Sequence, residues 1–320
     1  MSRQPIPASS SAAAVRSSTS KKHRAQQRIA RRRRLRWAAI AGLFAVAAVG
    51  TAAWLANADA SPLRSGGADG ATLASYRPPD LHALVVSATD PQTITFGHHQ
   101  GMLVSQDGGA TWKPLPGAAG KDAMGLALPP NSKTAYAAGH DVFLRSDDGG
   151  QSWSAVRPAL PGTDIHGFTA SATQPNTFYA YVVGFGLFRS TDGGTTWAAV
   201  AQPPGSTMSL AAARSGSSEI LFASTMEGMA RSSDGGRSWE PLRDVPAGSV
   251  SAVGETVYVA DRGTVMASTD SGRTWQRRSF PRSAGLIAVA PTNTNLVYVV
   301  TDRREVWRSA DAAATWTRVG

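Results

Sequence analysis

The sequence contains a set of His and Met residues at a constant spacing of 42 residues: His82, Met124, His166 and Met208. Imidazole and thioether groups together suit a soft or borderline metal ion such as copper. Three further histidines lie in short segments that contain glycine: His98, His99 and His140. If the fold brings these segments together, the seven side chains form a site for a metal ion, a ligand or a protein partner. The alternative is that they fill the mouth of a channel and contact one another or bound water.

Three aspartates precede the first three of these positions by two residues: Asp80, Asp122 and Asp164. A glycoside hydrolase needs two carboxylates roughly 5–10 Å apart, and these aspartates are the one cluster in the sequence that could supply them. The alternative, which we favour, is that they are turn residues at the starts of strands. The sequence therefore leaves catalysis uncertain and favours a binding protein. If the protein is an enzyme, a glycoside hydrolase is the class expected.

These positions follow from an internal repeat whose clearest part is the octapeptide SQDGGATW at residues 105–112. Related octapeptides begin at residues 146, 190, 232, 268 and 309: SDDGGQSW, STDGGTTW, SSDGGRSW, STDSGRTW and SADAAATW. Their starts are 41, 44, 42, 36 and 41 residues apart. Six copies at such spacing indicate a chain built from repeats of roughly 40 residues.

Each repeat contains four short apolar runs separated by Gly, Pro, Asn and Asp, a pattern typical of β-strands. Four strands in roughly 40 residues are typical of one propeller blade. We therefore predict an all-β fold, a six-bladed β-propeller over residues 81–320. The first strand of each blade then lines the central axis. The octapeptides lie on one face, and the starts of the first strands and the turns between second and third strands lie on the other, here called the mouth face.

The octapeptides resemble the Asp-box (BNR) repeat, which is found in sialidases, sortilin-type receptors and photosystem II assembly factors, and the resemblance covers residues 81–320. It implies a turn between the third and fourth strands of each blade. In such a turn, Asp and Ser bond to the local backbone and Trp packs against the blade. A structural role is therefore predicted for twelve residues: Asp107, Trp112, Asp148, Trp153, Asp192, Trp197, Asp234, Trp239, Asp270, Trp275, Asp311 and Trp316. The sixth box has Ala313 where Gly is expected, which predicts a strained or differently shaped turn.

The sequence does not supply the catalytic residues of a sialidase. That chemistry needs an Arg triad on the mouth face, whereas four arginines directly precede a box Ser and so belong to the opposite face: Arg145, Arg189, Arg231 and Arg308. The first strands and GH turns also resemble a subgroup of Asp-box proteins labelled glycosyl-hydrolase-like, which implies shared fold more than shared activity. The resemblance to photosystem assembly propellers implies a third interpretation, an assembly factor that docks a membrane protein.

The N-terminal segment differs from the rest of the chain in charge. Residues 1–36 hold 11 Lys and Arg residues and no Asp or Glu, which leaves 21 basic and 22 acidic residues elsewhere. The net charge of +10 therefore belongs to this tail, and a nucleic-acid partner for the repeats is disfavoured. The sequence has no cysteine, which excludes disulfides and thiolate chemistry.

The basic tail is followed by 20 uncharged residues, Trp37 to Ala56. A helix of this length spans roughly 30 Å, about one bilayer core, so this segment predicts a membrane partner and a single-pass cell-membrane protein. The basic side is expected to stay cytoplasmic, with the propeller outside the cytoplasm. A cleaved signal ending at Ala58–Ala60 is the alternative, but its apolar region is normally only roughly 7–15 residues long. The expected layout is tail 1–36, transmembrane helix 37–56, linker 57–80 and propeller 81–320.

Overall fold

The computed structural model describes residues 70–129, 132–203 and 205–320. All of them lie in the C-terminal of two compact units, Ser65–Gly320. The described part is almost entirely β-structure, and its short helix α2 covers Leu73–Tyr76. This β-structure consists of short strands separated by Gly-rich turns, which agrees with the strands predicted from the short apolar runs.

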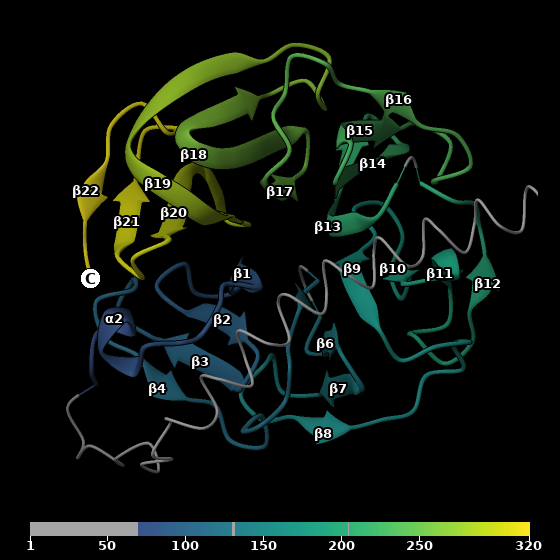
Figure 1. Ribbon diagram of the computed structural model, residues 1–320, viewed down its shortest axis with the longest axis horizontal. Coiled ribbons are helices and arrows are strands. Elements are labelled where there is room, and N and C mark those ends of the chain that lie inside the picture. The colour runs from purple at the N-terminus through teal and green to yellow at the C-terminus, as the bar shows by residue number, and fades with distance from the viewer. Residues whose placement is uncertain (1–69, 130–131, 204) are drawn as a thin grey trace, which may run out of the picture. The chain divides into compact units, whose positions relative to one another are not determined.

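The strands form antiparallel sheets arranged around a central axis (Figure 1). The first sheet comprises β1 (Ala83–Val86), β2 (Ile94–His98), β3 (Gly101–Ser105) and β4 (Lys113–Pro114). The second comprises β5 (Gly125–Ala127), β6 (Ala135–Gly139), β7 (Val142–Ser146) and β8 (Ser154–Ala155). The third comprises β9 (Ile165–Ala170), β10 (Phe178–Val182), β11 (Gly186–Ser190) and β12 (Ala198–Ala199). The fourth comprises β13 (Thr207–Ser215), β14 (Ser218–Thr225), β15 (Gly228–Ser232) and β16 (Glu240–Pro241).

The last sheet differs from the others because it has six strands. It comprises β17 (Ser249–Val253), β18 (Thr256–Ser268), β19 (Gln276–Ala290), β20 (Asn293–Thr301), β21 (Val306–Ser309) and β22 (Thr317–Arg318). The described residues thus form five sheets, and the prediction of six blades is wrong. The fifth and sixth boxes, which follow β18 and β21, share one sheet.

Two long strands explain why the last two repeats are not separate blades. The N-terminal half of β19 pairs with β18, and its C-terminal half pairs with β20. β19 therefore follows the fifth box and also leads into the sixth repeat without a break. The fifth repeat is the shortest, with box starts 36 residues apart. Its second and third strands are accordingly joined into one strand, β18, with no separating loop. The register of β18 on β19 shifts between Arg262, whose φ is 50°, and Thr264.

The ring closes by packing between the first and last sheets. One buried cluster combines Leu84 and Phe96 of the first sheet with Leu286 and Tyr298 of the last. The Tyr298 hydroxyl donates to the Pro91 carbonyl oxygen at 3.0 Å. Tyr258 occupies the corresponding position in the preceding repeat and donates to the Thr294 carbonyl oxygen at 2.9 Å. A buried Tyr on the second strand thus links successive repeats, and the last link joins the end of the chain to its beginning.

The predicted transmembrane helix, Trp37–Ala56, lies outside the described residues. Among the residues that the structure does describe, no helix is long and apolar enough to cross a membrane. The prediction of a propeller preceded by a membrane-spanning helix, and the cell-membrane location drawn from it, are corrected accordingly and are not carried further. The basic tail and the linker up to residue 69 also lie outside the described residues.

Candidate functional site on the mouth face

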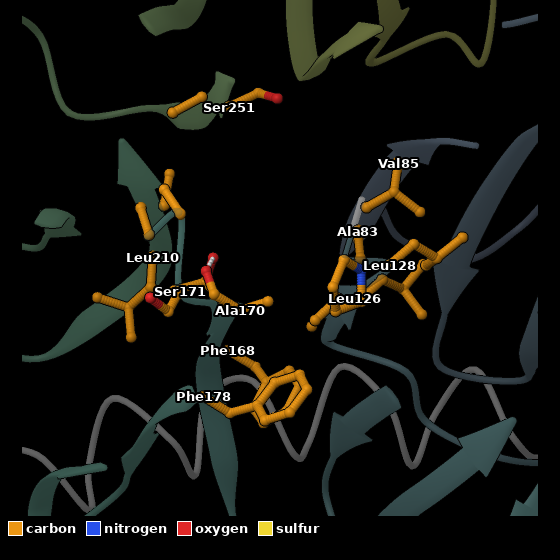
Figure 2. Close-up of a pocket in the computed structure, with 18 of the residues that line it drawn as sticks. Ala83, Val85, Leu126, Leu128, Phe168, Ala170, Ser171, Phe178, Leu210 and Ser251 are labelled. Carbon is orange, nitrogen blue, oxygen red and sulfur yellow. Dashed lines mark hydrogen bonds between the residues drawn. The ribbon is translucent and has the colours of Figure 1, made fainter. Parts of the chain in front are cut away.

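An axial cavity of about 680 Å³ runs between the inner strands of the sheets. Its walls come from six strands: β1, β5, β9, β13, β17 and the C-terminal half of β19. Figure 2 shows Ala83, Val85, Leu126 and Leu128 on one side of it and Ser171 and Leu210 on another. This volume is in the range of small-molecule pockets, and the wall combines aliphatic side chains with many Ser and Thr hydroxyls. The cavity therefore offers both apolar and hydrogen-bonding contacts along its length, and His82 and His166 add two imidazoles at its mouth.

The box turns show why their aspartates are not free for chemistry. In the first box, Ser105 Oγ donates to Asp107 Oδ1 at 2.8 Å and accepts from the Gly109 N–H at 2.8 Å. The Asp107 carboxylate accepts from the N–H and hydroxyl of Thr111, and Trp112 Nε1–H donates to the Gly109 carbonyl at 3.0 Å. Every carboxylate oxygen thus has a partner within its own turn. The other boxes repeat this arrangement between Ser and Asp.

Hydrogen bonding also sets the protonation of these aspartates. The hydroxyl and backbone N–H of Thr196 lower the pKa of Asp192 to about 2. Ser238 lowers the pKa of Asp234 to about 2 in the same way. A general acid needs the opposite shift, towards neutral pH. The geometry and charge of the boxes therefore suit a turn, as the residue types indicate.

The sixth box keeps the turn at a conformational cost. Ala312 and Ala313 have φ values of 57° and 65°, a region that favours glycine. Ser309 Oγ still accepts from the Ala313 N–H at 2.9 Å. Trp316 Nε1, however, has no hydrogen-bond partner among the described residues, unlike the Trp of the first box. The backbone of the sixth turn is therefore strained, but it has positive φ values at the same two positions as the first box, Gly108 and Gly109.

On the mouth face, four histidines and three aspartates form one continuous cluster. The imidazoles follow one another edge to face in the order His82, His99, His140, His166, with ring centroids 4.5, 5.9 and 5.1 Å apart. Carboxylates lie between them: Asp80, Asp122 and Asp164. We call these seven residues the His/Asp cluster. The structure thus brings together residues that lie up to 86 positions apart, between 80 and 166.

Asp122 is the centre of the cluster. Its Oδ1 lies 3.0 Å from His82 Nδ1, and its Oδ2 lies 2.6 Å from His140 Nδ1. The side chain is only 12 % exposed. Burial acts to raise the pKa of Asp122. The hydrogen bond from His82 and the charges of the nearby imidazoles have the larger opposite effect, so the pKa is lowered. Asp122 is therefore a fixed anion that orients two histidines.

A close backbone approach allows the contact between Asp122 and His140. β6 ends at Gly139, immediately before His140, and a Cβ at Gly139 would lie 1.8 Å from the Asp122 carbonyl oxygen. Only a residue without a side chain fits there. The turn continues through Asp141, which has a φ of 54° and whose N–H donates to the Thr163 carbonyl oxygen at 2.9 Å. The backbone therefore holds His140 between the second and third sheets.

The remaining predicted site residues do not all join the cluster. His98 is buried, stacks on Phe96 with ring centroids 5.8 Å apart, and accepts the Gln100 N–H at its Nδ1. Burial is also the main cause of its lowered pKa. Met124 and Met208 line the mouth of the cavity, and Met208 is 47 % exposed. The observed polar partners of the clustered imidazoles are carboxylates and other imidazoles, so oxygen and nitrogen replace the expected thioethers.

The sequence interpretation missed an apolar surface beside this cluster. Among the described residues, four large hydrophobic side chains are exposed: Val183, Phe185, Met208 and Met226. Val183 and Phe185 lie in the turn between β10 and β11, and Met226 lies in the turn between β14 and β15. These are turns between second and third strands, and Met208 lies at the start of β13, so all four residues belong to the mouth face of the third and fourth sheets. Met208 was already among the predicted site residues, whereas the other three were not. Their position in mouth-face turns was the available signal.

The radial sheets, the axial cavity and the box turns define the class of protein as an Asp-box β-propeller. The family model described as photosynthesis system II assembly factor YCF48 matches residues 83–316. This match covers most of the chain, and the protein therefore belongs to that family. The predicted resemblance to Asp-box propellers is confirmed. No match is found among the curated proteins.

Solved structures resemble this chain at low sequence identity, and the two with TM-scores above 0.5 share its fold. A YCF48 bound to a D1 peptide is 21 % identical with a TM-score of 0.48, over 75 % of this chain and 82 % of that one. The GH74 enzyme of Niastella koreensis is 16 % identical with a TM-score of 0.51, over 77 % of this chain and 47 % of that one. The GH74 xyloglucanase of Xanthomonas campestris is 18 % identical with a TM-score of 0.52, over 75 % and 45 %. The chain thus matches less than half of either GH74 enzyme.

Proposed function

We propose that this protein is a binding propeller of the assembly-factor kind, which holds a segment of a protein partner on its mouth face. The observation that carries the proposal is the location of Val183, Phe185, Met208 and Met226. Isolated exposed apolar residues are ordinary, but a group on one face marks an interaction site. Aromatic and Met side chains are also enriched among the residues that anchor protein interfaces.

Charge beside these residues supports a polypeptide partner with a polar or cationic part. Asp80, Asp141 and Asp164 are carboxylates on the same face, and the Val183 N–H donates to the Asp164 carbonyl oxygen at 2.9 Å. A partner segment could place apolar side chains on the third and fourth sheets and a polar portion over the His/Asp cluster. Family membership supports the same interpretation, since the family is described as an assembly factor and one YCF48 was solved with a D1 peptide.

The glycoside hydrolase alternative has weaker support. Its candidate carboxylates, Asp80, Asp122 and Asp164, each contact a histidine within 3.0 Å. The pKa of Asp122 is lowered, whereas the acid of such an enzyme has a raised pKa. The likeness to GH74 enzymes is a likeness of fold, and fold does not determine chemistry.

Site-specific photo-crosslinking in the producing cell tests the partner proposal. A photoreactive amino acid is placed at Phe185 or Met226 on the mouth face, and at Gln151 in the second box as the matched exposed control. We expect one discrete protein adduct from the two mouth positions, identified by mass spectrometry, and its loss when Met208→Ser is added. Equal crosslinking from Gln151, or an adduct that Met208→Ser leaves unchanged, would contradict the proposal.

A further inference from the structure

Three atoms of the His/Asp cluster are placed as the ligands of one metal ion. His140 Nε2, His166 Nε2 and Asp164 Oδ1 are each 3.0 Å from the other two. A point about 1 Å out of the plane of this triangle lies about 2 Å from all three atoms, the length of a zinc bond to His nitrogen or carboxylate oxygen. We propose that His140, His166 and Asp164 bind a single divalent metal ion of the zinc type.

Asp164 provides an independent reason for a cation here. Its Oδ1 is shielded from solvent and accepts no hydrogen bond from the described residues, although two imidazole nitrogens lie 3.0 Å away. The Nε2 atoms of His140 and His166 hydrogen-bond to each other at 3.0 Å and not to this oxygen, and an anionic oxygen left without a partner is costly. A metal ion at the common point satisfies the oxygen and both imidazole lone pairs.

Asp122 prepares His140 for this role. The contact of 2.6 Å between Asp122 Oδ2 and His140 Nδ1 places the imidazole proton on Nδ1. Nε2 is then the nitrogen with a free lone pair. A carboxylate behind a ligating histidine is the usual support of zinc sites, because it fixes the tautomer and the orientation of the ring. Gly139 and Asp141 hold the same histidine through the backbone.

The ligand atoms determine which ion fits. Two imidazole nitrogens and one carboxylate oxygen favour Zn²⁺ and similar dications, whereas a soft copper site needs sulfur ligands. His140 and Asp164 are 41 % and 45 % exposed, so a fourth position remains open to water or to a ligand, unlike a closed structural site. The other half of the cluster is less regular: His99 Nδ1 is 2.5 Å from Asp80 Oδ2, but His82 Nε2 is 3.5 Å from it. We therefore assign one ion, on the side of His166.

The metal site does not depend on the proposed partner, because it is tested with Zn²⁺ alone. The purified full chain is stripped with a chelator and titrated with Zn²⁺ by calorimetry, and bound metal is counted after dialysis. We expect one equivalent of Zn²⁺ with saturable affinity and a zinc-dependent rise in the midpoint of thermal unfolding. His140→Asn keeps a donor near Asp122 but removes Nε2, and it should weaken binding at least tenfold, as should His166→Ala.

Two variants separate the site from general electrostatic attraction. Asp164→Asn should weaken Zn²⁺ binding at least tenfold. Glu227→Gln removes an exposed charge in the turn between β14 and β15 on the same face, so its affinity should stay within twofold of the parent. His82→Asn should likewise retain the ion. Absence of saturable binding to the parent chain would overturn the proposal. The proposal would also be overturned if Glu227→Gln and Asp164→Asn lost affinity equally, or if His82→Asn lost the ion while His140→Asn retained it.

Discussion

The two faces of the propeller use the same strands for opposite purposes. On the box face, each Asp bonds to the N–H and hydroxyl of a residue in its own turn, as Asp107 does with Thr111. On the mouth face, Asp122 bonds to histidines 40 and 18 residues away, in other sheets or turns. Because both oxygens of a box carboxylate already accept hydrogen bonds within the turn, the carboxylate is not available to bind another group. Asp122 instead bonds to groups from other parts of the chain and so forms part of a shared cluster. The comparison thus separates aspartates that complete a turn from aspartates that join residues of different repeats.

The largest expected effect comes from removing a box Trp. Trp112 is 1 % exposed and donates its Nε1–H to Gly109. Trp112→Ala should lower the free energy of unfolding by about 3–5 kcal/mol, through lost burial and a cavity. Trp316→Ala should cost less, because that side chain is only partly buried and its Nε1 has no described partner. Urea unfolding measures both changes, and equal losses would contradict the difference between the two boxes.

A substitution that moves the backbone at Gly139 should disrupt the contacts on the mouth face. Gly139→Ala puts a Cβ 1.8 Å from the Asp122 carbonyl oxygen, and the shift needed to relieve this clash should cost about 1–3 kcal/mol. It should also separate His140 from Asp122, which changes the NMR signal of the His140 Nδ1–H. Gly263→Ala is the matched control, since its nearest neighbour lies 3.7 Å from the added carbon. An unchanged His140 signal in a folded Gly139→Ala protein would argue against the proposed backbone constraint.

Acid should destabilise the box face in a defined pH range. Because the pKa values of Asp192, Asp234 and Asp311 fall to about 2 in the folded state, these groups add stability above their unfolded pKa of about 3.9. That contribution is lost as the pH falls from about 4 to about 2. Urea midpoints measured across this range should decline less steeply for Asp192→Asn. Asp147→Asn, at an exposed carboxylate paired with Arg145, is the control, and an equally reduced slope there would contradict the explanation.

The smallest effect should come from the imperfect sixth box. Ala312 is partly exposed with a φ of 57°, so Ala312→Gly should stabilise the fold by about 0.5–1 kcal/mol, after the entropy lost by glycine is subtracted. Ala313→Gly relieves similar strain but removes a fully buried methyl group from a core cluster, and it should give no net gain. Chemical unfolding of the two single variants compares them directly; destabilisation by Ala312→Gly would show that the turn is not strained.

The repeat, the strands and the box turns could all be predicted from the sequence, because each depends on interactions within a few residues. Alignment of the repeats also placed His82 and His166 at the cavity mouth, since the position within a repeat fixes the position around the axis. The number of separate sheets could not be obtained this way. It depended on whether β18 and β19 continue through the short fifth repeat, which is settled by long-range pairing such as Arg262 with Ala284.

By itself, then, the sequence determined an Asp-box propeller and the face on which its histidines gather, through local hydrogen bonding and a regular period. The tertiary structure alone decided what those histidines contact. It paired them with Asp80, Asp122 and Asp164 in place of the Met side chains, and it left Phe185 and Met226 exposed in turns of the same face. The physical reason is that side chains distant in the sequence meet only where the backbone allows it: the lack of a Cβ at Gly139 lets this strand approach the Asp122 carbonyl oxygen.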